Sequence, residues 1–272
     1  MGMNRRRSTN LVAVAVAASV LLSGCVTTQQ DRIGSNDGTD ACYQYRVALD
    51  STGNFYAEDM LKGAAIGAGV GAVSGGLIGG NLKGALIGAA AGAAVGTLGG
   101  YWSAKMQQGR DQAITGVMSD LDTENQNLNR TQVALDQLVN CRRAEITRVK
   151  ADYKAQRIGK PEAEQRLAAI RAQLDKDYAI ASTINQNIVK RRDEYLVAVD
   201  NIQPGSADKI RAKNASAKKT TKPTKPTTSA KGNSATQVVD RTNTAFETSE
   251  RIGNSTAAIQ QMAQKEATLD AV

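Results

Sequence analysis

Histidine is absent from this chain of 272 residues, and aromatic side chains are scarce, with 2 Phe, 1 Trp and 7 Tyr. Without histidine there is no imidazole to act as a general base, to activate a nucleophile or to ligate most transition metals. The sequence also has no Walker loop, no CxxC pair and no nucleophile elbow. We therefore expect no enzyme, no catalytic residue and no metal site.

The scarcity of aromatic residues also limits the kind of core that the chain can form. Small side chains supply much of the 41% hydrophobic fraction, so a large aromatic-rich core is not expected. Acidic and basic residues are interspersed along helical patterns, which is typical of solvated helix faces. The composition predicts an all-α protein with low-complexity segments.

Residues 1–24 have the features of a lipoprotein signal peptide. Residues 5–7 are arginines, and residues 11–22 form an apolar run that is too short to span a bilayer. The run ends in four residues that resemble the bacterial lipobox: Leu22, Ser23, Gly24 and Cys25. This resemblance implies cleavage before Cys25 and the covalent attachment of diacylglycerol and palmitate to this cysteine. The alternative is an ordinary secretory peptide with an accidental cysteine.

Lipidation at Cys25 would attach the mature chain to a membrane, because two or three acyl chains give stable anchoring. Val26, rather than Asp, follows Cys25. In lipoproteins of this kind, that difference favours the outer membrane over the inner membrane. Cleavage removes three arginines and no acids, so the net charge falls from +8 to +5. We expect a lipid-anchored outer-membrane protein whose helical region lies in the periplasm.

Cys42 and Cys141 are the two remaining cysteines. An oxidising periplasm allows them to form a disulfide. The pairing requires an extended path through residues 42–53, which the sequence Ser51-Thr52-Gly53-Asn54 makes plausible by interrupting a helix there. Free thiols or intermolecular bonds are the alternatives.

Two runs within residues 61–102 carry a glycine at every fourth position, and the second run repeats the first with an offset of 21 residues. The glycines are Gly63, Gly67, Gly71, Gly75 and Gly79, then Gly84, Gly88, Gly92, Gly96 and Gly100. A helical glycine costs about 1 kcal/mol relative to alanine, so two such helices need a compensating interaction. Glycines four residues apart form a groove that another backbone can approach closely. We predict two membrane helices in a hairpin that self-associates.

Both ends of the predicted hairpin carry residues typical of a membrane interface, with Lys62 at one end and Lys83 at the other. Tyr101 and Trp102 close the second run, where aromatic residues favour the headgroup region. These features resemble the glycine-zipper two-helix outer-membrane lipoproteins, the rickettsial surface-antigen family and its enterobacterial relatives. The resemblance covers the signal, Cys25 and residues 61–102, and it implies an envelope protein. A flexible Gly/Ala tract is the alternative.

Residues 103–203 have the pattern of an antiparallel coiled-coil hairpin. Apolar residues recur every seven positions at Ile114, Leu121, Leu128 and Leu135, while Glu124 and Thr131 interrupt the second seam. Around Gly159-Lys160-Pro161 the pattern stops and restarts, with glycine expected at the C′ position of the first helix. If the chain folds back there, residues whose numbers add to about 319 face each other across the hairpin. Leu138 and Ala181 are one such pair. The hairpin is either a partner-binding stalk or a spacer.

Lysine, threonine and proline dominate residues 204–234, which predicts a disordered basic linker. No aromatic residues interleave with these lysines, so we expect no nucleic-acid binding, whereas contact with peptidoglycan is an alternative to a plain linker. Residues 235–272 have weak helical spacing, with a helix end expected at Gly253, and are predicted to dock on the hairpin or on a partner.

These features predict six segments: signal peptide (1–24), lipidated linker (25–60), membrane hairpin (61–102), periplasmic hairpin (103–203), basic linker (204–234) and amphipathic tail (235–272). The expected function is that of a structural or assembly scaffold of the cell envelope. Membrane lipid and either copies of itself or an envelope complex are the expected partners. A ring of hairpins that forms a pore or secretion channel is the alternative.

Overall fold

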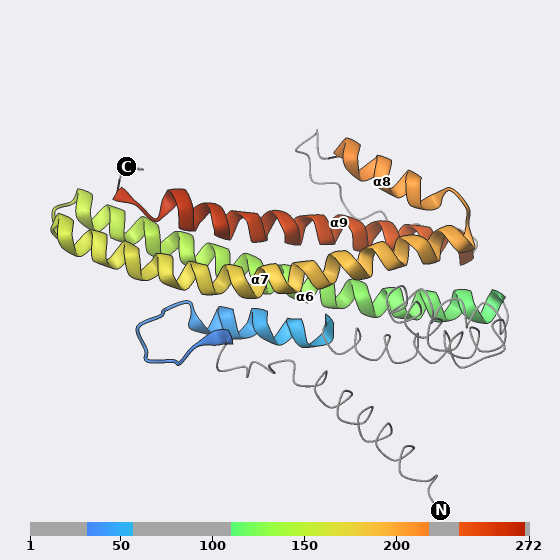
Figure 1. The fold of residues 1–272 in the computed structure, drawn as a ribbon, viewed down its shortest axis with the longest axis horizontal. Coiled ribbons are helices and arrows are strands. Elements are labelled where there is room, and N and C mark those ends of the chain that lie inside the picture. Colours follow the sequence, from blue (N-terminus) through green and yellow to red (C-terminus); the bar gives the residue numbers. More distant parts are fainter. Residues whose placement is uncertain (1–31, 57–109, 218–233, 270–272) are drawn as a thin grey trace, which may run out of the picture. The chain divides into compact units, whose positions relative to one another are not determined.

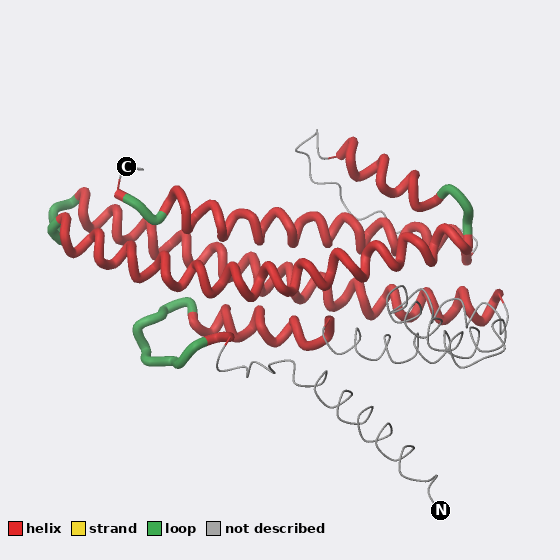
Figure 2. Tube along the Cα trace, in the orientation of Figure 1, coloured by secondary structure: helices red, strands yellow, loops and turns green. Residues whose placement is uncertain are grey.

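The computed structural model describes residues 32–56, 110–217 and 234–269. Helices dominate this part of the chain and no strand occurs in it, so the all-α prediction is confirmed (Figure 2). Among the described residues, no helix combines the length and apolar character that a bilayer crossing requires. The predicted membrane hairpin, residues 61–102, lies outside the described residues.

The chain divides into two units, residues 1–35 and residues 36–272, and the helices below all belong to the second. Its two longest helices are α6 (Arg110–Lys154) and α7 (Lys160–Ile202). Helix α6 continues through Gly116 without interruption. At the end of α6, Gln156 takes the left-handed C′ position with φ 56°, and Arg157 N donates to Asp152 O at 2.9 Å. Gly159, expected at C′, is instead the N-cap of α7, and the proline in the first turn of α7 fits the helix start.

Helices α6 and α7 lie antiparallel, and ion pairs between them fix their register. Arg142 Nε lies 2.7 Å from Asp177 Oδ2, and these residue numbers add to 319. The second pair, Glu124 and Arg191, follows nearly the same register. Leu135, Leu138, Ala181 and Ile184 are all buried in one hydrophobic cluster, as the predicted hairpin requires.

Helix α9 (Ser234–Gln261) packs along both α6 and α7 (Figure 1). It runs parallel to α6, since Arg241 bonds to Asp122 and Ser255 bonds to Asp136. A short π-helix (Met262–Glu266) follows. The predicted helix end at Gly253 is wrong, because α9 passes through this residue without a break. The pair α6–α7 is therefore part of a larger bundle and not an isolated two-helix coiled coil.

Residues 43–56 form a further helix, although an extended path was expected from residue 42 to residue 53. Cys42 is joined to Cys141, and Tyr56 lies beside Thr131, so this helix runs antiparallel to α6. Leu49 and Tyr56 are fully buried, and Gly53 closely approaches Ile184 on α7. Residues 43–56 belong to the bundle rather than to a linker, because their apolar side chains are buried against α6 and α7.

The end of the bundle that contains the start of α6 has a second hydrophobic cluster. It combines residues of α6, α7, α9 and α8 (Ser206–Ala217), including Leu121, Val199, Ile210 and Val238. Helix α8 occupies part of the segment expected to be a disordered linker. Its formation follows from Ala207 and Ile210, which bury apolar surface in this cluster. Residues 218–233, the remainder of the Lys/Thr/Pro segment, lie outside the described residues.

Candidate functional site

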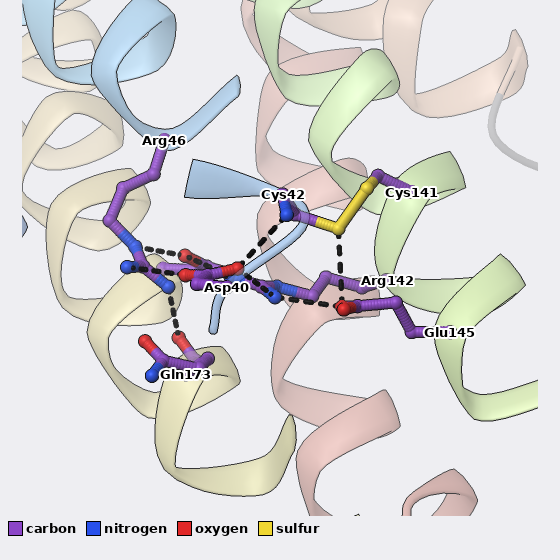
Figure 3. The surroundings of a disulfide bond; sticks show 8 residues. Asp40, Cys42, Arg46, Cys141, Arg142, Glu145 and Gln173 are labelled. Carbon is purple, nitrogen blue, oxygen red and sulfur yellow. Dashed lines mark hydrogen bonds and ion pairs between the residues drawn. A yellow bond between two sulfur atoms is a disulfide. The ribbon is translucent and has the colours of Figure 1, made fainter. Parts of the chain in front are cut away.

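A disulfide between Cys42 and Cys141 joins the segment before helix 43–56 to the middle of α6. The two sulfurs are 1.99 Å apart, and the bond links positions separated by 99 residues (Figure 3). Its partners come close because helix 43–56 lies antiparallel to α6, not because residues 42–53 are extended. Of the alternatives that the sequence left open, the structure has the intramolecular pair.

A buried ion-pair cluster lies beside this disulfide (Figure 3). Asp177 on α7 accepts from Arg46 Nε at 2.5 Å and from Arg142 Nε at 2.7 Å. Asp40 bridges the same two guanidinium groups, with 2.8 Å to Arg46 Nη1 and 2.7 Å to Arg142 Nη1. Asp40 Oδ1 also accepts from Cys42 N at 3.0 Å. The cluster therefore links three segments, residues 40–46, α6 and α7, through one network of ion pairs.

Glu145 is the third carboxylate of the cluster and lies against the disulfide. Its Oε2 is 2.8 Å from Arg142 Nη1 and 3.2 Å from Cys42 Sγ. A disulfide sulfur carries no hydrogen, so the sulfur contact becomes a hydrogen bond only when Cys42 is a thiol. Asp40, Cys42 and Glu145 place their donor atoms within 4.8 Å of one another, as a metal site would. The disulfide withholds the thiolate, however, and both carboxylates are already paired with Arg142, so this group does not fit a metal ion.

The cluster favours the charged forms of Asp40 and Arg142. Burial by itself would raise the pKa of Asp40, but the hydrogen bond and charge of Arg142, followed by the charge of Arg46, outweigh it and hold that pKa below 3.8. Burial would likewise lower the pKa of Arg142, yet its hydrogen bonds to Asp40 and Asp177 raise it. Because the pKa values of Asp40 and Arg142 move apart, a proton does not pass easily between them, and the arrangement suits attachment better than acid–base chemistry.

A second polar contact holds the other end of helix 43–56. Glu124 and Arg191 form a buried pair between α6 and α7, and the Arg191 guanidinium lies 4.9 Å from the Phe55 ring centroid. Tyr56 OH is 3.4 Å from Thr131 Oγ1. Burial, followed by the charge of Glu124, raises the pKa of Tyr56, so its phenol stays protonated and can donate to Thr131. Helix 43–56 is thus bound near both of its ends by charged or polar partners on the hairpin.

Of the site residues that the sequence predicted, only Cys42 and Cys141 lie in the described part of the chain. The lipobox (residues 22–25), the ten zipper glycines, Tyr101 and Trp102 lie outside it. Sequence reasoning missed the ion-pair cluster, although its signal is present. Arg142 lies seven residues after Leu135, and Asp177 lies seven residues after Ile170. Charges of opposite sign therefore occupy facing seam positions, where two apolar residues would otherwise meet.

Comparison with known proteins gives one similarity. Residues 3–104 match the family model of the YMGG-like Gly-zipper, which covers less than half of the chain. No curated protein and no solved structure shows significant similarity to the chain. The matched range contains the two glycine runs, so the N-terminal part of this protein is similar to Gly-zipper segments of the YMGG-like type.

Proposed function

We propose that this protein is an outer-membrane lipoprotein, in which a self-associating glycine-zipper hairpin holds a periplasmic helical bundle that acts as an envelope scaffold. The Gly-zipper match over residues 3–104 supports membrane association. Cys25 at the end of an apolar run supports lipidation, and the Cys42–Cys141 disulfide is typical of an exported protein. Lipid and further copies of the chain are the proposed partners, and peptidoglycan is the proposed contact of the lysine-rich segment.

The single observation that carries this proposal is the direction in which the chain leaves and re-enters the bundle. Helix 43–56 runs antiparallel to α6, since Cys42 pairs with Cys141 and Tyr56 contacts Thr131. The Tyr56 end of this helix therefore points toward the end of the bundle where α6 begins at Arg110. The segment between helix 43–56 and α6 therefore begins and ends on the same side of the membrane. If it enters the bilayer, it must cross it an even number of times. Two glycine runs meet that requirement.

No catalytic activity is part of the proposal. Two buried acids of the described residues, Asp177 and Glu124, are paired with arginines, and the sequence has no histidine. A scaffold also accounts for the way the disulfide and the two ion pairs are placed. They fix the segment before the zipper to the helices after it, so a force on the membrane hairpin is carried into the bundle.

Replacement of the lipidated cysteine tests the proposal. Cys25→Ser is expected to abolish incorporation of labelled palmitate and to reduce the amount of protein in the membrane fraction. The double variant Cys42→Ser, Cys141→Ser is the matched control and is expected to keep the label. Unchanged labelling of Cys25→Ser would refute lipidation at this position. Loss of label with full retention in the membrane would show that the zipper alone suffices for attachment.

A further inference from the structure

The two cysteines of the disulfide differ in the exposure of the whole residue to solvent. Cys42 is fully buried, with 0% of its surface exposed, whereas Cys141 is partly exposed at the edge of the hydrophobic cluster. In thiol–disulfide exchange an incoming thiolate attacks one sulfur and displaces the other, so access decides which sulfur receives it. Access favours attack at Cys141 and release of Cys42.

The charges around Cys42 oppose its release as a thiolate. Glu145 Oε2 lies 3.2 Å from Cys42 Sγ, and Asp40 lies against the backbone of the same residue. The described cluster contains three carboxylates, Asp40, Asp177 and Glu145, and two arginines, Arg46 and Arg142, so it carries one net negative charge. A further negative charge at Cys42 is unfavourable there, which slows opening of the bond. Once protonated, the Cys42 thiol can donate a hydrogen bond to Glu145.

We propose that Cys141 is a thiol-exchange site, at which a small thiol or a protein dithiol forms a mixed disulfide while Cys42 is released and retained beside it. The incoming thiolate forms a bond to Cys141 Sγ, and the Cys42–Cys141 bond breaks with its electron pair going to Cys42. Cys42 then takes a proton from solvent. The incoming thiol and Cys42 exchange places, so no external oxidant is required. The reverse step, attack by Cys42 on the mixed disulfide, restores the original bond.

Retention of Cys42 follows from contacts that do not involve sulfur. Arg46 remains paired with Asp177 and Asp40, and Arg46 Nη2 donates to Gln173 O at 3.2 Å. Leu49 and Tyr56 keep the same helix buried against the hairpin. Opening of the disulfide therefore leaves its two partners close together. The high local concentration of Cys42 limits the lifetime of the mixed disulfide.

Mapping the products of exchange by mass spectrometry tests the assignment. The oxidised full-length protein is incubated with excess glutathione at about pH 8, and free thiols are then blocked with N-ethylmaleimide. We expect glutathione on Cys141 and maleimide on Cys42, with the reverse pattern about tenfold less abundant. Cys42→Ser has no disulfide to open, so it is treated with oxidised glutathione, and the adduct that forms at Cys141 should persist because no neighbouring thiol removes it. A majority of glutathione on Cys42 in the wild-type protein would overturn the proposal.

A separate variant tests whether the charge of Glu145 slows the opening of the disulfide. Glu145→Gln keeps the size of the side chain but removes the charge next to Cys42, so the rate constant for opening by glutathione should rise about tenfold. Glu164→Gln is the control, because Glu164 is exposed and pairs with Lys160 at 3.7 Å, away from the disulfide. An opening rate in Glu145→Gln within about twofold of the control would contradict the proposed effect of the carboxylate.

Discussion

At the scale of single residues, Arg142 and Asp177 occupy seam positions where the heptad pattern calls for apolar side chains. Two buried charges need each other, because removal of one partner leaves the other uncompensated in a poorly solvated environment. Here Arg46 and Asp40 extend the pair, so each carboxylate oxygen of Asp177 meets a guanidinium nitrogen. The arrangement specifies which face of the hairpin receives helix 43–56.

Asp177→Asn is expected to lower the free energy of unfolding by about 3–5 kcal/mol, since it removes the buried charge that both Arg46 Nε and Arg142 Nε contact. Urea titration followed by circular dichroism measures the change. Glu162→Gln is the control, because Glu162 and Arg166 are about half exposed and such a pair contributes less than about 1 kcal/mol. A loss of less than about 1 kcal/mol in Asp177→Asn would contradict the assigned role of the cluster.

The lowered pKa of Asp40 makes part of the stability depend on pH. In the folded protein this pKa lies below the value of 3.8 that applies to an unpaired Asp. The unfolded chain therefore binds a proton first as the pH falls, so the contribution is complete above about pH 4 and is lost below it. Denaturant titrations at several pH values should show this loss in the wild-type protein and a smaller one in Asp40→Asn. Equal acid sensitivity of the two proteins would exclude Asp40 as the cause.

At the scale of helices, two glycines that look alike in the sequence have different surroundings. A Cβ at Gly253 in α9 would lie 3.6 Å from Asn185 Oδ1, an ordinary contact. A Cβ at Gly53 would lie 3.0 Å from Ile184 Cγ1 and 3.2 Å from its Cδ1, and Ile184 is only 4% exposed. Close packing prevents Ile184 from moving freely, so Gly53 is required by its neighbour whereas Gly253 is not.

Alanine at the two positions should therefore have opposite effects. Gly253→Ala is expected to raise the free energy of unfolding by about 0.5–1 kcal/mol, because alanine loses less backbone entropy in a helix. Gly53→Ala is expected to lower it by about 1 kcal/mol, because overpacking outweighs the same gain. Chemical denaturation of the two single variants measures both changes. A stabilised Gly53→Ala would show that Ile184 yields to the added methyl group.

The positions of the long helices were more predictable from the sequence than the residues at which helices end. The seam of Leu121, Leu128 and Leu135 indicated α6 correctly, because a spacing of seven creates one apolar stripe. Ser51-Thr52-Gly53-Asn54 instead suggested a break, and Gly253 suggested a helix end, but both lie within helices. Intrinsic propensity is worth about 1 kcal/mol per glycine, and burial of Leu49, Tyr56 and Ile252 exceeds it.

At the scale of the whole molecule, the proposed zipper requires association between helices. A single glycine-rich helix does not recover the free energy that its glycines cost. Gly71→Leu with Gly92→Leu is expected to reduce crosslinked oligomers strongly while palmitate labelling stays unchanged, because two isobutyl groups would block close helix approach. Val73→Leu, which adds one methylene away from the glycine positions, is the matched control. Persistence of the same oligomers in the double variant would exclude the zipper as their cause.

A conductance measurement distinguishes a scaffold function from a pore function of the same hairpin. Purified protein is added to planar lipid bilayers, and single-channel currents are recorded for the wild type and for the Gly71→Leu, Gly92→Leu variant. A scaffold is expected to give no discrete currents. Stepwise currents that disappear in the variant would favour the pore, because only a ring of closely packed hairpins loses its channel when the glycine groove is filled.

The sequence by itself determined the helical class, the two long helices of the hairpin and the absence of histidine chemistry. These features follow from composition and from the spacing of residues that are near one another in the chain. Only the tertiary structure decided that helix 43–56 lies along α6 and α7, that Cys42 reaches Cys141, and that Asp177 holds two arginines. Such contacts join residues about 35 to 131 positions apart, so they depend on the packing of whole helices and not on local preference.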